Sequence, residues 1–386
     1  MTAKKSTART ERIVGLFPEL LGVGGVQEAG RETAVALEEI AGRRGWATCF
    51  LSLNDPAGIR QFTANSRRIS LRGFGRSKPR FVFSALRAAF HDAGVVVASH
   101  PHLAVPAAWM RTMATRLRVI VMSHGVEVWE QLPSRRHRAL LRADLVLAPS
   151  RDTAQKLAQI QGVPAEKIRR LAWPLSPDFL GLAADPSRLP RLADFPQGRV
   201  ILTVGRWAAA EGYKGVDQLI RAFSELRPSI PDLRLAAVGE GDDLRRLQKL
   251  AADLGVADEV HFFSGLSRAE IAACYSRAEI FALPSAGEGY GLVFLEAMAF
   301  AKPLVGAAYG GVTDLIEDGV NGLLVPPRDA TPLRRALERL LKDRAFAGEL
   351  GRRGAERVRR LHRFEDFASA LEEILEQCGL DSPVAG

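Results

Sequence analysis

Residues 280–300 read IFALPSAGEGYGLVFLEAMAF, and this stretch decides the fold that we predict. It begins with a short apolar run (IFALPS), continues with a glycine-rich loop (AGEGYG) and ends in a helical pattern (LVFLEAMAF) that no Ser, Thr or Asp precedes. A strand, a loop and a helix in this order are typical of an open α/β sheet, in which ligands bind at the carboxyl ends of the strands. The free amides at the predicted helix start indicate an anion site.

Two glutamates flank this predicted anion site. Glu288 lies in the loop, and Glu296 lies in the second helical turn, where its side chain tilts back toward the helix start. Carboxylates on both sides of an anion can accept hydrogen bonds from hydroxyl groups on both sides of a diphosphate, so the pattern favours a nucleotide sugar as ligand. The alternative is an ordinary strand–loop–helix turn with two solvated glutamates.

The same rhythm of strand and helix runs through the whole chain. A first series of apolar strands is predicted at 13–17, 47–53, 95–99, 119–125 and 144–150, and a second at 200–206, 233–240, 260–265, 280–285, 303–308 and 322–327. These runs are mostly apolar throughout and do not alternate, which indicates parallel strands buried on both faces. A proline-rich stretch, 173–198, separates the two series. The sequence therefore predicts two doubly wound α/β domains facing each other across a cleft.

Composition narrows the class of protein. With 386 residues, 47% hydrophobic and 25% charged, the chain is long enough for two cores. Its three cysteines are widely spaced and form no CxxC pair, which excludes a disulfide framework or a zinc ribbon and fits a reducing compartment. We find neither a signal-peptide pattern nor an apolar run of about 18 residues. A cytoplasmic location is therefore expected.

Two other nucleotide-binding classes lose their sequence support. The stretches GVGGVQ (22–27) and GEGDDL (239–244) both begin with GxG but lack the third glycine of a dinucleotide fingerprint. The chain also contains no GxxxxGK[ST] motif. A dehydrogenase and a P-loop enzyme are thus disfavoured.

Two cations lie at the same predicted sheet edge as the glutamates. Arg206 comes directly after the strand 200–206 pattern, and Lys214 comes just before the next helix. A guanidinium and an ammonium at this edge could neutralise a departing diphosphate. For each cation alone, a solvated surface charge is the competing interpretation.

Taken together, these motifs resemble the retaining glycosyltransferases of family 4, which have the B-type fold of two Rossmann-like domains. The resemblance covers nearly the whole chain and is strongest from about 199 to 328. It rests on the E-x7-E pair Glu288 and Glu296, on VGRW…YKGVDQLI, on LAAVGEGDDLRRLQKLAADLGVADEVHFFSG, and in the first half on GG (24–25), HGVE (124–127) and ADLVLAPSRDT.

The resemblance implies a role for each matching position. Glu296 would bind the ribose hydroxyls, and Glu288 would bind the transferred sugar together with the main chain of Gly289, Tyr290, Gly291 and Leu292. Arg206 and Lys214 would bind the diphosphate, and Gly239, Ser264, Gly265 and Leu266 would line the base pocket. In the first domain, His124 would face the donor sugar, and Gly24 and Gly25 would allow a close approach to the phosphates. Without the family context, His124 could equally be a core or surface histidine.

The resemblance also implies a domain plan and a reaction. Residues 1–182 would bind the acceptor, 183–198 would form the linker, 199–364 would bind the donor, and a helix at about 365–380 would pack back on the first domain. The reaction would move a hexose from a GDP-mannose or UDP-glucose type of donor to a hydroxyl of a lipid-linked or cell-envelope glycan. The alternatives are a non-catalytic nucleotide-sugar-binding homologue, or an epimerase or phosphorylase with the same fold.

The expected chemistry follows from what the sequence lacks. There is no DxD motif and no His/Asp cluster with metal-ligand spacing, so no obligatory metal or other cofactor is expected. No obvious nucleophile lies beside the predicted donor site. Retention of configuration by front-face attack is therefore favoured over double displacement.

Charge is unevenly spread along the chain. Residues 1–180 hold 27 Lys and Arg and 14 Asp and Glu, a net charge of +13, whereas the remainder has a net charge of −4. Within the first half, the segment 66–90 places seven cations among four phenylalanines, of which Phe74, Phe81 and Phe83 lie between cations. No recognised nucleic-acid fold accompanies them, so nucleic acid is not an expected partner. The segment predicts an anionic membrane surface or an anionic lipid-linked acceptor, hence a peripheral position on the inner face of the membrane; a solvated basic face is the alternative.

Overall fold

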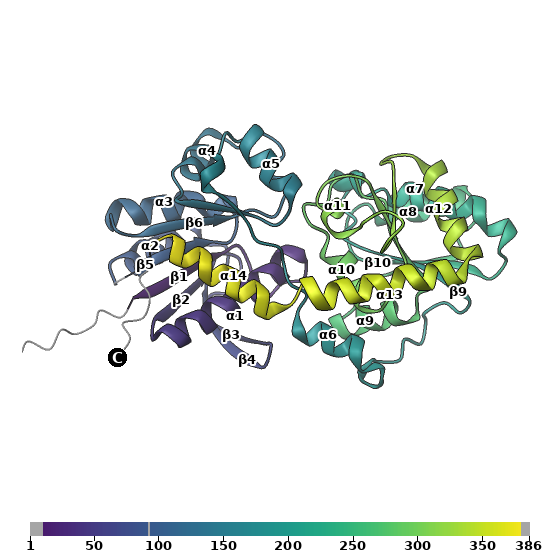
Figure 1. Ribbon diagram of the computed structural model, residues 1–386, viewed down its shortest axis with the longest axis horizontal. Helices are drawn as coiled ribbons and strands as arrows, with labels where there is room; N and C mark the ends of the chain where they lie inside the picture. The colour runs from purple at the N-terminus through teal and green to yellow at the C-terminus, as the bar shows by residue number, and fades with distance from the viewer. Residues whose placement is uncertain (1–10, 92, 380–386) are drawn as a thin grey trace, which may run out of the picture. The chain divides into compact units, whose positions relative to one another are not determined.

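The computed structural model describes residues 11–91 and 93–379 and divides into two compact units. Unit 1 comprises the described residues up to Pro174 together with the C-terminal segment from Phe364, and unit 2 comprises Leu175–Arg363. Figure 1 labels most helices and several strands of the two units.

Unit 1 is built on an eight-stranded sheet with the order β3-β4-β2-β1-β5-β6-β7-β8. Its strands are β1 (Arg12–Phe17), β2 (Ala47–Ser52), β3 (Gly58–Ala64), β4 (Arg67–Gly73), β5 (Ala93–Ala98), β6 (Arg118–Met122), β7 (Leu145–Ala148) and β8 (Ile168–Arg170). Its helices are α1 (Gly25–Arg44), α2 (Lys78–Ala89), α3 (Ala104–Met113), α4 (Ser134–Leu141), α5 (Arg151–Gln159) and α14 (Phe364–Gln377). Every strand pair is parallel except β3–β4.

Unit 2 is built on a six-stranded, wholly parallel sheet with the order β11-β10-β9-β12-β13-β14. Its strands are β9 (Arg199–Val204), β10 (Leu233–Val238), β11 (Val260–Phe263), β12 (Ile280–Leu283), β13 (Leu304–Ala307) and β14 (Leu323–Val325). Its helices are α6 (Pro177–Ala184), α7 (Val216–Leu226), α8 (Leu244–Asp253), α9 (Arg268–Arg277), α10 (Leu292–Ala299), α11 (Val312–Leu315), α12 (Ala330–Lys342) and α13 (Arg344–Leu361).

Both sheets reverse their winding beside the first strand of the unit. In unit 1 the chain moves from β1 to β2 on one side and later returns to β5 on the other; in unit 2 it moves from β9 to β10 and returns to β12. Such a reversal separates neighbouring loops and opens a crevice at the carboxyl ends of the two strands. The predicted doubly wound α/β fold is thus confirmed, and each unit has one crevice of this kind.

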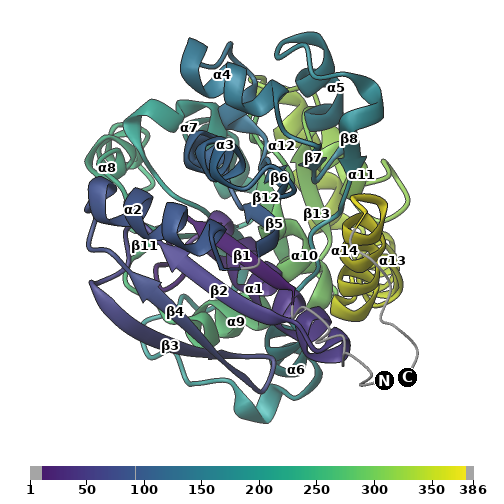
Figure 2. The ribbon, with the colours of Figure 1, turned by 90° about the vertical axis from the view of Figure 1, so that its left-hand side faces the viewer.

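The predicted strands are all present, but the sequence analysis missed the β3–β4 hairpin, which extends the unit 1 sheet at one edge (Figure 2). Its turn is Asn65–Ser66, with φ of 51° and 60°, the left-handed geometry of a two-residue hairpin turn. Only Ile69, Leu71 and Gly73 of β4 are buried; Ser70 and Arg72 lie between them, and Arg67 and Arg68 precede them. The basic character of this stretch concealed its alternation.

The structure moves the boundary between the units to Pro174/Leu175, ahead of the expected boundary at 182 and the expected linker at 183–198. The cause is Phe179 of α6, which is buried and packs edge-on against Tyr275 and Phe300 of unit 2. The buried Phe179 thus fixes part of the proline-rich stretch 173–198 to unit 2, although its prolines predicted a linker.

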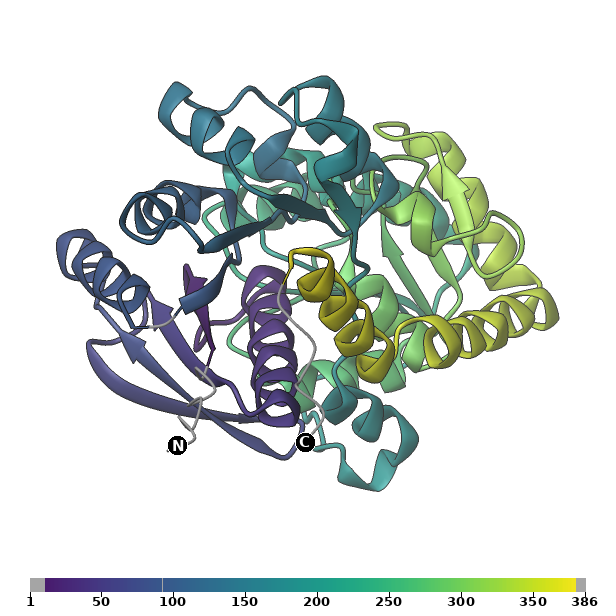
Figure 3. The same cartoon turned by 60° about the vertical axis from the view of Figure 1, so that its left-hand side comes forward.

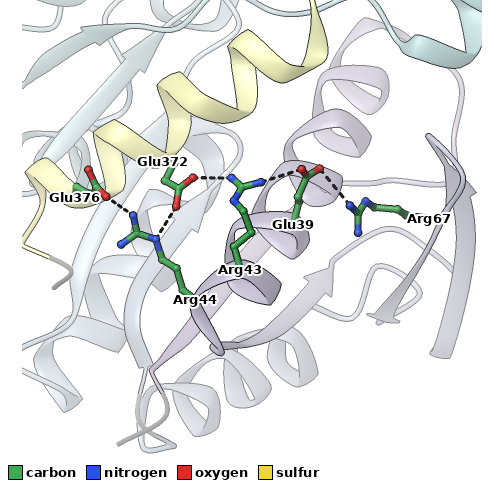
Figure 4. Close-up of polar contacts among 6 residues, drawn as sticks. All are labelled: Glu39, Arg43, Arg44, Arg67, Glu372 and Glu376. Atoms are coloured by element: carbon green, nitrogen blue, oxygen red, sulfur yellow. Dashed lines mark hydrogen bonds and ion pairs between the residues drawn. The ribbon is translucent and has the colours of Figure 1, made fainter. Parts of the chain in front are cut away.

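The helix expected at about 365–380 is α14 (Phe364–Gln377), and residue 380 lies outside the described residues. It belongs to unit 1 and packs along α1 (Figure 3). Glu372 accepts from Arg43 at 2.6 Å and from Arg44 at 2.7 Å, and Arg44 also pairs with Glu376 (Figure 4). Leu371 and Leu375 on the same helix are buried. Their burial supplies more stability than surface ion pairs, which contribute about 0–1 kcal/mol each.

Candidate functional site

The crevice of unit 2 is bordered by the loops that follow β9 and β12. These loops, 205–215 and 284–291, are joined by a hydrogen bond of 2.7 Å from the Ala286 amide to the Tyr213 carbonyl. Glycines allow the close approach, since a Cβ on Gly287 would lie 2.2 Å from the Tyr213 ring and one on Gly215 would lie 2.7 Å from the Pro284 carbonyl. Tight packing therefore fixes the loops that carry the predicted site residues.

Lys214 and Glu288 meet in this crevice. The Nζ of Lys214 lies 2.8 Å from Oε1 of Glu288, and their side chains are only 15% and 13% exposed. Burial alone would lower the pKa of Lys214, but the charge of Glu288 and the hydrogen bond to it outweigh burial and raise that pKa. Lys214 therefore remains an ammonium, with donors to spare for a ligand phosphate.

Arg206 takes a more open position than Lys214. Its side chain is 72% exposed and pairs with Glu211, which belongs to a 3₁₀ segment, Ala209–Lys214, inserted between the two cations. The hydrogen bond to Glu211 outweighs burial and raises the pKa of Arg206. The structure thus places both cations in one loop, with Lys214 enclosed and Arg206 facing solvent.

Glu296 is buried beneath the start of α10, with a partner on each carboxylate oxygen. Oε1 accepts from Arg268 at 3.2 Å, and Oε2 accepts from the hydroxyl of Tyr275 at 3.0 Å. Tyr275 is fully buried, and burial together with the charge of Glu296 raises its pKa well above 10. Sequence reasoning missed Arg268 and Tyr275, because both come from α9, which precedes the motif and carries no signal of its own.

The start of α10 has the predicted open geometry. Its N-cap is Gly291, which adopts the left-handed φ of 96° and provides no side-chain cap. The helix therefore starts without a side-chain cap, and an uncapped helix start is the kind of place at which anions bind. The Tyr290 side chain is buried and bonds to Nδ1 of His362 at 3.0 Å, so this side chain is committed to a contact within the fold.

The predicted base pocket lies where β10 and β11 end. Gly239 is irreplaceable here, because its φ is 155° and a Cβ would lie 1.7 Å from the Gly205 carbonyl. Ser264 donates from its hydroxyl to the Gly239 carbonyl at 2.9 Å, and the Gly265 amide donates to Glu240 at 2.8 Å. The Ser264 hydroxyl and the Gly265 amide therefore hold this loop in place by hydrogen bonds within the protein. Leu266, the remaining predicted position, follows directly after them in the sequence.

In unit 1, His124 follows β6 at the carboxyl edge of the sheet. Its Nε2 lies 2.6 Å from the carbonyl oxygen of Ser99, and its ring stacks between His100 at 5.7 Å and Trp173 at 5.3 Å. A carbonyl oxygen only accepts, so Nε2 of His124 must donate this hydrogen bond. The ring of His124 is thus fixed in position at the carboxyl edge of the sheet.

Gly24 and Gly25 lie after β1, beside the crevice of unit 1. Gly24 is the N-cap of α1 with a φ of 143°, and Gly25 is the first residue of that helix. The predicted site residues thus fall into two groups, each at the carboxyl edge of its own sheet.

Comparison with known proteins assigns the family. The model described as Glycosyltransferase Family 4 matches residues 23–178, and the model described as Glycosyl transferases group 1 matches residues 191–357. The chain belongs to glycosyltransferase family 4, as the sequence motifs suggested.

Curated relatives cover a substantial part of the chain. A GDP-mannose-dependent alpha-(1-6)-phosphatidylinositol monomannoside mannosyltransferase of Mycolicibacterium smegmatis is 36% identical over 269 residues, which are 64% of this chain and 68% of the relative. The alpha-D-kanosaminyltransferase of Streptomyces kanamyceticus is 35% identical over 196 residues, which are 50% of this chain and 49% of that one.

Solved structures share the fold at low identity. Sucrose-phosphate synthase from Thermosynechococcus elongatus superposes with a TM-score of 0.76 at 23% identity and covers 96% of this chain and 100% of its own. Anabaena HepE in complex with UDP-glucose has a TM-score of 0.73 at 20% identity, with 95% and 99% covered. These likenesses confirm the two-Rossmann-domain fold.

The His100 site gives a testable pH dependence of stability. Burial, and then the nearby His124, His102 and Arg136, lower the pKa of His100 from 6.5 to about 2. Below pH 6.5 the unfolded chain therefore binds a proton that the folded unit does not, and stability falls as pH falls. From pH 7 to pH 5 the loss due to His100 should reach about 2 kcal/mol. His100→Gln should remove this part, while the pKa values of His102 and His261, which burial also lowers, still contribute.

Urea unfolding at both pH values, followed by tryptophan fluorescence, measures this difference, because four of the five tryptophans (Trp46, Trp109, Trp129 and Trp173) lie in unit 1. The exposed His91→Gln variant is the control and should keep the wild-type loss. An equal pH dependence in wild type and His100→Gln would contradict the assignment.

Proposed function

We propose that this glycosyltransferase moves a hexose from a nucleoside-diphosphate sugar, of the GDP-mannose or UDP-glucose type, to a hydroxyl of a lipid-linked or cell-envelope glycan. The observation that carries the proposal is the largely enclosed Lys214–Glu288 pair beside the uncapped start of α10. A cation, helix amides and a carboxylate within one crevice match a diphosphate joined to a hydroxylated ring. The GDP-mannose dependence named for the Mycolicibacterium relative supports the first of the two donor types.

Each residue of this crevice receives a role under the proposal. Lys214, Arg206 and the dipole at the start of α10 stabilise the charge that develops on the departing diphosphate. Glu288, whose position the Lys214 ammonium fixes, accepts from hydroxyls of the transferred sugar. Glu296, fixed by Tyr275 and Arg268, retains lone pairs that can accept from the ribose hydroxyls.

We further propose that the anomeric configuration is retained by front-face attack. The bond between the anomeric carbon and the diphosphate oxygen breaks while the bond to the acceptor oxygen forms on the same face. The acceptor's proton passes to the departing phosphate oxygen. Glu288 is a poor nucleophile in this arrangement, since the Lys214 ammonium already holds its Oε1 at 2.8 Å.

The competing function, a non-catalytic nucleotide-sugar binder, would retain the nucleotide contacts but would not need the Lys214–Glu288 pair. A phosphorylase or epimerase of the same fold would retain the sheet but require a different ligand in the crevice. The enclosed ammonium–carboxylate pair favours a transferase over the binder.

The division of roles between the glutamates gives a first test. Glu288→Gln should lower kcat by about 100-fold or more and change nucleotide affinity little, because Glu288 acts on the sugar. Glu296→Gln should mainly weaken UDP or GDP binding, by about tenfold for a lost charge-assisted hydrogen bond. Calorimetry with UDP and GDP and steady-state kinetics measure both effects, and the wild-type titration selects the base.

The matched control is Glu279→Gln. Glu279 pairs with Arg199 at 2.6 Å, at the amino edge of the same sheet, and should affect neither value. Equal losses of nucleotide affinity in the Glu288 and Glu296 variants would refute the division of roles.

The cation roles give a second test. If Lys214, Arg206 and helix amides balance the diphosphate charge, transfer should continue at an unchanged rate in excess EDTA. The measurement is product formation with and without chelator. Loss of activity that Mn²⁺ restores would show that an ion is obligatory.

The acceptor side of the proposal concerns the outer face of α2 and the sheet edge beside it. Arg80, Phe83, Arg87 and Phe90 follow one another at helical spacing, and Phe83 and Phe90 are 64% and 65% exposed. The buried Leu51 on β2 packs in the same core as α2, so its side chain lies on the α2 side of the sheet. Arg72 is in register with Leu51 and lies on the same side. Arg68, four residues earlier on β4, lies on this side as well, because strand side chains alternate between the two faces. No helix among the described residues is both long and apolar enough to cross a membrane.

We propose that this face, which we call the α2 face (Arg68, Arg72, Arg80, Phe83, Arg87 and Phe90), docks on an anionic bilayer next to a lipid-linked acceptor. Exposed aromatic rings and cations on one surface match the interface and headgroups of such a membrane. This face contains only part of the segment 66–90 that the sequence predicted. Arg67 points to the other side of β4 and pairs with Glu39 at 3.6 Å.

Vesicle sedimentation tests this docking. Wild type should bind vesicles that contain anionic lipid, and binding should fall as added salt shortens the Debye length from about 10 Å at 0.1 M to about 3 Å at 1 M. Changing Phe83 and Phe90 to Ser, together with the four arginines of the α2 face, should abolish binding and leave nucleotide affinity intact. A matched control changes four exposed arginines of unit 2, which are Arg335, Arg344, Arg359 and Arg360. A wild-type protein that ignores anionic vesicles even at low salt would overturn the docking.

A further inference from the structure

The loop Pro18–Gly24, which we call the glycine loop, borders the crevice of unit 1. It follows β1, which lies between β2 and β5 in the sheet, and leads into α1. Gly22 and Gly24, with Gly25 after them, give this stretch unusual backbone freedom. A loop of this composition at a ligand crevice requires contacts from elsewhere if it is to keep one shape.

Asp55 supplies such contacts from the β2–β3 connection. Its side chain is buried, and its two oxygens accept the amides of Leu20 at 2.8 Å and Leu21 at 3.1 Å. The hydroxyl of Ser52, at the end of β2, also donates to Asp55 at 2.6 Å. The carbonyl oxygen of Asp55 accepts the amide of Gly75 at 2.8 Å, so the main chain of this residue is fixed as well.

Arg31, on the second turn of α1, supplies the complementary contacts. Its guanidinium donates to the carbonyl oxygens of Leu20 at 2.6 Å and Gly22 at 2.9 Å and also pairs with Glu28. The loop is therefore held through its amides by an anion and through its carbonyls by a cation. These contacts turn the Leu20 and Gly22 carbonyl oxygens toward Arg31, and so keep their negative ends satisfied within the protein.

We propose that Asp55 and Arg31 are positioning residues that hold the glycine loop in the shape that receives the donor, an assignment that rests on the proposed function. The amides that an anionic donor needs lie at the loop's end, at Gly24 and Gly25, and their direction depends on the path of the residues before them. With the loop preformed, donor binding does not have to order a flexible glycine segment. Both residues act through the loop that they hold.

Two substitutions test the role, each beside a matched control in the same unit. Asp55→Asn removes one of the two charged acceptors, and Arg31→Lys replaces a fork with a single ammonium that cannot serve both carbonyls and Glu28. The control for the first is Asp144→Asn, because Asp144 also accepts a backbone amide, that of Val119 at 2.8 Å. The control for the second is Arg111→Lys, because Arg111 also bonds a carbonyl and a carboxylate. Asp144 and Val119 lie at the amino edge of the sheet.

Two quantities are measured for each variant: the amide hydrogen exchange of the ligand-free protein and the steady-state kinetics with the donor. In Asp55→Asn and Arg31→Lys, the amides of Leu20 and Leu21 should exchange faster, and the donor KM should rise about tenfold while kcat changes little. The affinity for free UDP or GDP should fall by a similar factor, because these nucleotides carry the same diphosphate as the donor. The controls should lose comparable thermal stability but keep the wild-type exchange at Leu20 and Leu21 and the wild-type donor KM.

Two results would overturn the assignment. Faster exchange without a change in donor KM would mean that the contacts are structural only, and unchanged exchange would mean that they do not hold the loop. Failure of the proposed function looks different, because the wild-type enzyme would then show no donor turnover at all. A variant that does not fold is replaced by its partner, since Asp55 and Arg31 act on the same loop from separate elements.

Discussion

Both units depend on one constraint, which is that parallel strands deliver all their following loops to the same edge of a sheet. A reversal of winding then leaves a crevice beside the strand where the reversal occurs. In unit 2 that strand is β9, and the crevice receives Lys214 from the loop after β9 and Glu288 from the loop after β12. Without this geometry, two charges that are 74 positions apart in the sequence would not meet.

The meeting of these charges explains much of the local packing. An ion pair with both side chains largely enclosed is stable only if its geometry is fixed and its remaining hydrogen-bonding groups are served. Close contacts at Gly215 and Gly287 bring the loops together, and the Ala286–Tyr213 hydrogen bond ties them. A ligand with a diphosphate and a hydroxylated ring would enter a site whose charges are already in place, which lowers the reorganisation that transfer requires.

Unit 1 uses the same edge in a different way. The ring of His124 is held by stacking, and the glycine loop, which leads to the predicted positions Gly24 and Gly25, is held by the Asp55 and Arg31 contacts. Unit 2 contributes paired charges at its edge, whereas unit 1 contributes a fixed ring and a fixed main chain. Membership of glycosyltransferase family 4 is consistent with both sets, since the family models match one half of the chain each.

The sequence by itself determined the strand–helix order, the two α/β domains and the stretch that contains the E-x7-E pair. These properties depend on local hydrophobic pattern, on glycine and on helix starts, all of which are visible within about 20 residues. Only the tertiary structure decided the β3–β4 hairpin, the assignment of α6 to unit 2 and the partners of the site residues. Tyr275 and Arg268 reach Glu296 from α9, and Asp55 reaches Leu20 from another connection. Such contacts join elements that packing brings together, and no periodicity along the chain encodes them.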